Sequence, residues 1–280
     1  MKVLFYKVDM DTCLTAFILG VSEKDELVPL QGDASPDDLA NPEILCIEVG
    51  GSGQTELNNF DHHDPAGPRE PACRQAYQRR GGNNRLARLV DYVSLIDLEG
   101  SKAVPEAGFP TLNQLFSGML LCTTRPNEQL QKGIQIFATL LNRGFDPFDT
   151  MPPLPEWQRY IEAKEQGIQE AQQVRSEVTT VQSKSGLNIG FLQSEYMGAV
   201  GIIYGLGCHV AVVCHPNFGY PPVRKFTIAG NDIQVSQLIP VFNALEPGWG
   251  GSATGTIIGS PRGGSKLTLS QVVEIVKQNI

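Results

Sequence analysis

In the first half of the sequence, short apolar segments typical of buried strands alternate with longer segments of helical pattern. The strand-like segments cover residues 3–8, 44–49 and 57–60, and the helical patterns cover residues 12–19, 85–96, 111–121 and 129–141. Strands that alternate with helices favour a mostly parallel sheet with helices on both faces. We therefore expect an α/β fold whose N-terminal domain has a Rossmann-like parallel sheet.

The second half of the sequence has a different organisation. Four prolines between residues 146 and 155 indicate a boundary, and the polar, Glu- and Gln-rich segment that follows favours a helix. Later segments are strand-like at residues 177–182, 187–192, 210–214 and 224–228, and helical at 270–278. We expect an N-terminal domain at residues 1–150, a linker and connecting helix at 151–178, and a smaller mixed α/β domain at 179–280.

The charge balance narrows the range of partners. The chain of 280 residues has 22 Lys and Arg against 30 Asp and Glu, which gives a net charge of −8. An acidic chain is a poor match for long nucleic acid or for an anionic membrane surface. Residues 65–90, however, contain six arginines and one glutamate, a net charge of +5. The positive charge of this window is compatible with a small phosphorylated substrate or a short oligonucleotide as the partner.

Two further patterns bear on location. Residues 196–223 contain no charged side chain, but glycines and prolines interrupt them, which favours a short helix and a buried strand over a membrane span. The six cysteines form no C-x-x-C pair, so we expect buried thiols and a cytoplasmic protein. Cys208-His209 and Cys214-His215 flank a strand-like segment of ~20 Å, so both pairs cannot ligate one ion.

Acidic and imidazole side chains follow the predicted strands directly. Asp9 and Asp11 come after the first strand, Glu48 lies near the end of the second, and Asp61-His62-His63 follows the third. Ligands of open parallel sheets bind beyond the carboxyl ends of the strands. Carboxylates and imidazoles suit Mn²⁺, Mg²⁺, Zn²⁺ or Fe²⁺, and pairs of metals about 3.5–4 Å apart hydrolyse phosphate esters. Each acid alone could instead be a helix cap, Asp11 in particular.

These motifs, together with Gly248-Trp249-Gly250-Gly251, make the sequence resemble the DHH phosphoesterase superfamily. That superfamily includes exopolyphosphatases, manganese pyrophosphatases, oligoribonucleases and RecJ-type exonucleases. The resemblance covers nearly the whole chain. It implies a catalytic domain, a connecting helix and a C-terminal substrate-binding domain.

The resemblance also implies roles for individual residues. Metal binding would fall to Asp9, Asp11, Glu48, His62 and Asp97, with Asp91 as the alternative to Asp97. Asp9 and Asp11 would bind separate metals, and Glu48 would bridge them. Asp61 would orient an imidazole, and His63 would face the substrate phosphate. The implied cofactor is a divalent metal, Mn²⁺ first and Mg²⁺ as the second candidate.

The sequence departs from the superfamily pattern at several positions. Phe5 and Lys7 stand where other members have a metal-binding His or Asp, and Glu48 replaces the usual Asp. One hypothesis is that the Lys7 ammonium replaces a second cation beside Asp9, which leaves one metal on Asp11, Glu48, His62 and Asp97. The alternative is that Lys7 points into solvent. Ser252 stands where the superfamily has a substrate-binding His.

Candidate contacts to substrate phosphates lie in both halves of the chain. Arg79 and Arg80 could attract anions, because guanidinium groups match phosphate oxygens, or they could lie on a solvated helix face. In the C-terminal domain the candidates are Arg224, Lys225, Gly250, Gly251, Ser252 and Arg262. Glycines let backbone N–H groups approach phosphate closely, although tight turns explain the glycines equally well.

These observations favour a metal-dependent phosphoesterase that hydrolyses a small polyanion such as polyphosphate, a nucleotide or a short oligonucleotide. The second hypothesis is a degenerate superfamily member that binds a phosphorylated ligand without turnover. The sequence leaves a homodimer open.

Overall fold

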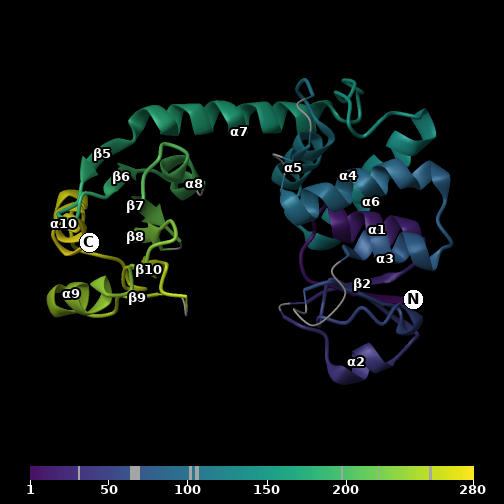
Figure 1. Ribbon diagram of the computed structural model, residues 1–280, viewed down its shortest axis with the longest axis horizontal. Coiled ribbons are helices and arrows are strands. Elements are labelled where there is room, and N and C mark those ends of the chain that lie inside the picture. Colours follow the sequence, from purple (N-terminus) through teal and green to yellow (C-terminus); the bar gives the residue numbers. More distant parts are fainter. Residues whose placement is uncertain are drawn as a thin grey trace. The chain divides into compact units, whose positions relative to one another are not determined.

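The computed structural model describes residues 1–30, 32–63, 70–100, 103–104, 107–196, 198–219, 221–251 and 254–280. The chain divides into two compact units, Met1–Glu165 (unit 1) and Gln166–Ile280 (unit 2) (Figure 1). The boundary falls inside the 20-residue helix α7 (Gln158–Glu177), which connects the units. The segment expected to connect the domains, residues 151–178, contains all of this helix.

Unit 1 is built on a parallel four-stranded sheet. Its strands are β1 (Lys2–Phe5), β2 (Glu26–Pro29), β3 (Ile44–Ile47) and β4 (Asn59–Phe60), in the order β2-β1-β3-β4. Val3 pairs with Leu27 on one side and with Leu45 on the other, so the apolar β1 occupies the middle of the sheet. All four strands point the same way, which brings their carboxyl ends to one edge of the sheet.

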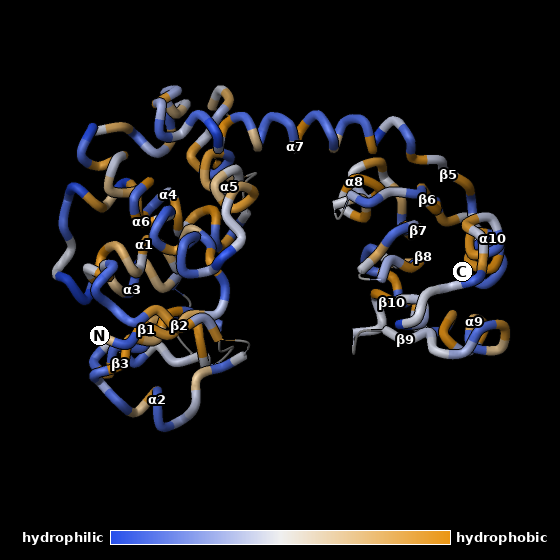
Figure 2. The backbone as a smooth tube through the Cα atoms, turned by 180° about the vertical axis from the view of Figure 1, so that it is seen from behind, coloured by the Kyte–Doolittle hydropathy of each residue, from blue (hydrophilic) through white to orange (hydrophobic). Residues whose placement is uncertain are grey.

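Helices cover both faces of this sheet. They are α1 (Met10–Leu19), α2 (Pro36–Ala40), α3 (Ala72–Arg79), α4 (Asn84–Glu99), α5 (Leu112–Cys122) and α6 (Pro126–Arg143), with a 3₁₀ turn η1 (Thr55–Leu57). Figures 1 and 2 show α1, α3, α4 and α6 on one side of the sheet and α2 on the other. Phe5, Phe60 and Phe137 are fully buried in the core between the sheet and the larger helical layer.

Unit 2 has a mixed six-stranded sheet. Its strands are β5 (Thr179–Gln182), β6 (Asn188–Gln193), β7 (Val210–Phe218), β8 (Val223–Gly230), β9 (Gly250–Gly251) and β10 (Ile257–Gly259), in the order β5-β6-β7-β8-β10-β9. Only β6 and β7 pair in parallel among the described strands of this unit. The helices are α8 (Ala199–Tyr204), α9 (Leu238–Leu245) and α10 (Leu269–Asn279). The core contains the stacked rings of Phe242 and Trp249, whose centroids lie 4.0 Å apart.

The predicted fold class is confirmed: a parallel α/β unit is followed by a mixed α/β unit. Among the local differences from expectation, two concern β1 and β2. β1 ends at Phe5 instead of continuing to residue 8, because the chain turns there into the N-cap of α1. β2 was not expected; its polar first residue, Glu26, and its last residue, Pro29, resemble loop sequence, and both are tolerated on an edge strand.

The structure also bears on the predictions about membrane spans and cysteines. Of the described helices none is long and apolar enough to cross a membrane. All six cysteines are free thiols, and five of them are buried, the exception being Cys122. Cys208 and Cys214 lie on either side of the buried start of β7, as expected for a core strand.

Gly118 provides a test of the packing between α5 and α7. A methyl group at Gly118 would lie 1.9 Å from the carbonyl oxygen of Tyr160, which is backbone and cannot swing aside. We expect Gly118→Ala to lower the free energy of unfolding by about 1–3 kcal/mol, because this clash outweighs the higher helix propensity of alanine. Urea unfolding followed by tryptophan fluorescence measures the change, since Trp157 reports on unit 1 and Trp249 on unit 2.

Gly201 in α8 is the matched control, because among the described residues no side chain, and no backbone atom from outside its own helix, lies within 4 Å of the position that a methyl group would take. Gly201→Ala should raise the stability of unit 2 by about 0.5–1 kcal/mol. Equal effects of the two substitutions would contradict the close helix crossing.

Candidate metal-binding site

Asp9 and Asp11 lie at the start of α1, just beyond the end of β1. Asp9 is the N-cap residue: its backbone is extended, and its Oδ1 accepts a hydrogen bond from the N–H of Thr12 at 3.0 Å. The alternative interpretation of Asp11 as the cap was therefore wrong. Asp11 lies inside the first turn of the helix, where its side chain points away from the cap and toward α3.

Asp11 binds the beginning of α3. Its two carboxylate oxygens accept hydrogen bonds from the N–H groups of Ala72 and Cys73, each at 2.8 Å. Pro71, the N-cap residue of α3, offers no side-chain acceptor, so Asp11 satisfies two of the N–H groups that any helix leaves unpaired at its start. The hydrogen bonds to Cys73 lower the pKa of the Asp11 carboxyl, but the effect of burial is larger, because Asp11 is only 1% exposed. The pKa is therefore raised to about 6.

Glu48 follows β3 in an unusual backbone conformation. Its φ of 57° lies in the left-handed region, which costs free energy in a residue other than glycine. The N–H of Glu48 still donates to the carbonyl of Phe60 at 2.9 Å, which extends the β3–β4 pairing. Its buried Oε1 has no hydrogen-bond partner in the described part of the chain. Burial, and then the charge of Asp11, raise the pKa of Glu48 to about 11.

Asp61 fixes the orientation of His63 at the end of β4. Its Oδ2 accepts from the N–H of Gly51 at 2.8 Å, and its Oδ1 accepts from the N–H of His63 at 3.0 Å. The same Oδ1 lies 2.8 Å from His63 Nδ1. Because Asp61 holds Nδ1, the other ring nitrogen, Nε2, is left for a ligand. The His63 side chain is 63% exposed, so this nitrogen is accessible.

His62 lies at the centre of a group of carboxylates. Its Nε2 is 3.1 Å from Asp97 Oδ2, 3.5 Å from Glu48 Oε1 and 4.0 Å from Asp11 Oδ2. The neighbouring carboxylate of Asp97 raises the pKa of the imidazole. Although these oxygens are close, none of them is aligned with Nε2 for a hydrogen bond, and Nε2 has no hydrogen-bond partner among the described residues.

The helix α4 contributes Asp97 to this group, whereas Asp91 lies elsewhere. Asp91 forms an ion pair with Arg74 at 2.8 Å and is largely exposed. The two positions are six residues apart, which separates them by about 120° around a helix. A helix that presents Asp97 to His62 therefore turns Asp91 away from it.

The donor set of this group fits a divalent cation. The carboxylates of Asp11, Glu48 and Asp97 converge on the imidazole of His62. Carboxylate oxygens together with a neutral imidazole are ligands of Mn²⁺ and, with more oxygen, of Mg²⁺. Two sets of residues each offer three ligand atoms that lie within 4.8 Å of one another. One set is Glu48, His62 and His63, and the other is Asp11, His62 and Asp97. One cation beside His62 could therefore contact members of both sets.

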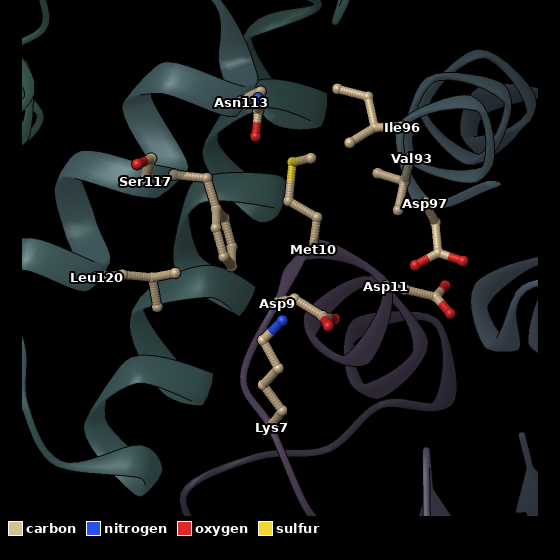
Figure 3. A pocket seen from close by; sticks show the side chains of 11 residues that line it. Lys7, Asp9, Met10, Asp11, Val93, Ile96, Asp97, Asn113, Ser117 and Leu120 are labelled. Atoms are coloured by element: carbon tan, nitrogen blue, oxygen red, sulfur yellow. The ribbon is translucent and has the colours of Figure 1, made fainter. Parts of the chain in front are cut away.

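Two cavities of unit 1 meet at these acids. One has a volume of about 330 Å³ and the other about 530 Å³, and both are lined by Lys7, Asp9 and Asp97. The larger cavity also contains Glu48, Asp61 and His63 in its wall. Figure 3 shows the Lys7 side chain pointing toward Asp9 in the smaller cavity. Phe5, by contrast, is 0% exposed in the core and contributes nothing to either cavity.

The structure does not bring Arg79 and Arg80 to these cavities. Arg80 Nη2 donates to the carbonyl of Leu19 at 2.9 Å. Leu19 is the last residue of α1, ten residues from Asp9, which places this contact about 15 Å along the helix axis. Arg79 is exposed at the last position of α3, whereas the site contacts the first turn of that helix.

The remaining phosphate-binding candidates belong to unit 2. Lys225 Nζ donates to the carbonyl oxygens of Ser260 and Pro261, and Arg224 Nη1 donates to the carbonyl of Leu267. Arg262 is exposed, and burial, with the charge of Arg262 second, lowers the pKa of Lys225.

Gly250 and Gly251 form the short strand β9, which pairs with β10. A methyl group on Gly251 would lie 2.5 Å from the carbonyl oxygen of Ile257, so strand packing alone requires glycine there. Ser252 lies outside the described residues.

Several cavity residues were missed in the sequence. Tyr6, Gly32, Asp33 and Gly51 line the larger cavity, and Asn113 and Ser117 of α5 line the smaller one. Tyr6 adjoins a predicted strand end and could have been included on that ground. No motif marks Asn113 and Ser117, because helix packing alone brings α5 to the site.

One of the comparisons with known proteins bears on the fold. No protein-family model matches the sequence, and no curated protein is similar to it. The pGpG-specific phosphodiesterase PggH of Vibrio cholerae superposes with a TM-score of 0.56 at 16% identity, over 92% of this chain and 91% of that one. This likeness shows that the two chains share a fold.

Two further solved structures match less closely. The DHH domain of a protein described as a member of a family of ribosomal proteins has a TM-score of 0.38 at 10% identity, over 98% of this chain and 84% of that one. An uncharacterized protein from Helicobacter pylori G27 has a TM-score of 0.32 at 11% identity, over 98% of each chain. We draw no conclusion from these two scores.

The buried Glu48 makes the stability of the metal-free protein depend on pH. Its pKa of about 11 in the folded chain exceeds the ordinary value of 4.5, so the folded state retains a proton that the unfolded chain releases. The resulting stabilisation is complete below pH ~4.5 and is lost progressively as pH rises toward the folded pKa. In EDTA, Glu48→Gln should have a higher free energy of unfolding than the parent. This difference should grow between pH 5 and pH 8, at a rate of up to about 1.4 kcal/mol per pH unit.

Urea unfolding at several pH values measures this difference. Glu128→Gln is the control, because Glu128 is an exposed acid whose recorded partner, among the described residues, is Arg125. A stability difference for Glu48→Gln that stays constant over this range would show that Glu48 ionises freely in the folded protein.

Proposed function

We propose that this chain is a divalent-metal-dependent phosphoesterase of the DHH superfamily, acting on a small phosphorylated polyanion. The observation that carries the proposal is the position of His62 Nε2, unaligned with any hydrogen-bond partner among the described residues and within 4.0 Å of three carboxylate oxygens. Such a buried, acid-rich arrangement is costly without a cation and favourable with one. The fold shared with PggH, which is named as a pGpG-specific phosphodiesterase, supports the same reaction class.

The cation would be held by Asp11, Glu48, His62 and Asp97. When bound, it would supply Lewis-acid chemistry, namely the polarisation of a phosphoryl oxygen and the activation of water. It would also make the site attractive to phosphate, because acidic side chains outnumber Lys7 in the wall of the larger cavity. Mn²⁺ is the first candidate and Mg²⁺ the second, on the basis of the mixed oxygen and nitrogen donors.

His63 is the proposed catalytic imidazole. Asp61 holds His63 Nδ1 and leaves Nε2 free, and the His63 side chain lines the larger cavity. From there Nε2 can contact a phosphoryl oxygen or give a proton to the leaving group. In carboxylate–imidazole pairs of this kind the acid fixes the orientation of the ring.

The substrate class is broad at this level: polyphosphate, a nucleotide or a short oligonucleotide. The residues of unit 2 proposed to bind its phosphates are Arg224, Lys225, Gly250, Gly251, Ser252 and Arg262. We further propose a cytoplasmic location, which the free thiols of this chain support.

We also propose that Lys7 takes the place of a second metal. Lys7 lines both cavities together with Asp9, while Asp9 uses one carboxylate oxygen to cap α1. An ammonium group beside Asp9 would repel a second cation there. The site would then hold one ion.

Metal counting tests the role of Lys7. We expect one tightly bound Mn²⁺ per chain in the parent, and two in Lys7→Asp, because the substitution removes a positive charge and adds a carboxylate beside Asp9. Titration calorimetry with Mn²⁺ and elemental analysis after dialysis give the stoichiometry. Lys24→Asp, at an exposed position away from both cavities, should bind one ion as the parent does. Two tightly bound ions in the parent would refute this role.

Activity tests the function itself. The protein, with Mn²⁺ or Mg²⁺, should be screened for hydrolysis of polyphosphate, pyrophosphate, short RNA and cyclic and linear dinucleotides. We expect His62→Ala and Asp97→Asn to lower kcat/KM at least about 100-fold, because each removes a metal ligand. Asp91→Asn is the matched control on the same helix and should retain the parent activity, since Asp91 pairs with Arg74 instead.

The outcomes separate two hypotheses. Full activity in His62→Ala would contradict the proposed site. Absence of hydrolysis for every substrate, combined with a rise in melting temperature on adding one of them, would identify a binding protein that has lost turnover.

A further inference from the structure

The smaller cavity has a chemical character that metal and phosphate do not explain. One end carries the carboxylates of Asp9, Asp11 and Asp97 together with the ammonium group of Lys7. The rest of its wall is largely apolar and comes from α1, α4 and α5, through Met10, Val93, Ile96, Phe116 and Leu120. A phosphate or a hydrated cation would find few partners along this wall. A volume of about 330 Å³ lies within the range of small-molecule sites.

Two polar side chains interrupt the apolar wall. Asn113 and Ser117 lie four residues apart and therefore on the same face of α5, as Figure 3 shows for these two residues and Leu120. Ser117 Oγ accepts a hydrogen bond from Lys164 Nζ at 3.0 Å, so its position is fixed by α7.

The backbone of Asn113 is also fixed, while its side chain is left free. Its N–H donates to the hydroxyl of Tyr92 at 3.1 Å, and a capping box of Thr111 and Gln114 holds the first turn of α5. The carboxamide of Asn113 makes no hydrogen bond to any described residue and lines the cavity. A half-buried carboxamide that is held in place and makes no hydrogen bond within the protein is available to a ligand. It can offer the ligand both donors and an acceptor.

We propose that this cavity binds the nucleobase of a substrate nucleotide, with the Asn113 carboxamide hydrogen-bonded to the edge of the base. This inference rests on the proposed function and narrows its substrate class. A base combines flat apolar faces, which suit Met10 and Leu120, with a polar edge that an amide can match in pairs of hydrogen bonds. The carboxylates at the other end of the cavity place the base beside the proposed metal. Inorganic polyphosphate has no apolar part and would leave this wall uncovered.

The first experiment compares substrates with and without a base. We expect kcat/KM for the dinucleotide pGpG to exceed that for a 5′-phosphorylated abasic dinucleotide by at least about tenfold, since stacking and edge contacts both contribute. Asn113→Leu has a side chain of similar size and should lower this ratio at least about fivefold, the effect of losing a hydrogen-bonding group. Asn142→Leu is the matched control: Asn142 is exposed on α6, lines neither cavity and should leave the ratio unchanged.

A binding measurement keeps this inference separate from the proposed function. Calorimetry with GMP and with ribose 5-phosphate does not require turnover. Tighter binding of GMP, lost in Asn113→Leu and kept in Asn142→Leu, would support the nucleobase site even if no substrate were hydrolysed. Equal binding of the two ligands, or hydrolysis whose preference for the base is unchanged in Asn113→Leu, would overturn it. Thermal melting of each variant verifies that it is folded.

Discussion

The central constraint in unit 1 is the convergence of buried carboxylates around one imidazole nitrogen. Asp11 and Glu48 lie almost completely inside the protein, and Asp97 lies 3.1 Å from His62 Nε2. Burial and mutual repulsion raise the pKa values of Asp11 and Glu48, which means that the acids are held together at a cost. Two backbone N–H groups of α3 hold the Asp11 carboxylate and offset part of this cost, and a bound cation would offset more of it.

The anchoring of the acids shows how structure and site depend on one another. Asp11 accepts two N–H groups from the start of α3, so it joins α1 to α3 as well as facing His62. Asp9 caps α1 with one oxygen and lines both cavities. Glu48 adopts a left-handed backbone conformation directly after β3. A change of charge at Asp9 or Asp11 therefore also disturbs the start of a helix.

Part of this arrangement could be predicted from local sequence. The apolar segments at residues 44–49 and 57–60 predicted strands, and the acids that follow them were expected at one edge of a parallel sheet. The edge strand β2 was missed because Glu26 and Pro29 carry no strand signal. The prediction of two arginines near the substrate rested on charge and on the chemistry of the guanidinium group, and Arg80 instead contacts the far end of α1. Charge in a sequence window says nothing about which end of a helix faces a site.

The sequence by itself determined that this chain forms a parallel α/β unit with Asp11, Glu48, Asp61 and His62 just past strand ends, because strand direction brings those ends to one edge. Only the tertiary structure decided that Asp97, and not Asp91, lies next to His62. It also decided that Asn113 faces the smaller cavity. Both depend on how α4 and α5 are rotated as they pack on α1, and that rotation is set by contacts between residues far apart in the chain.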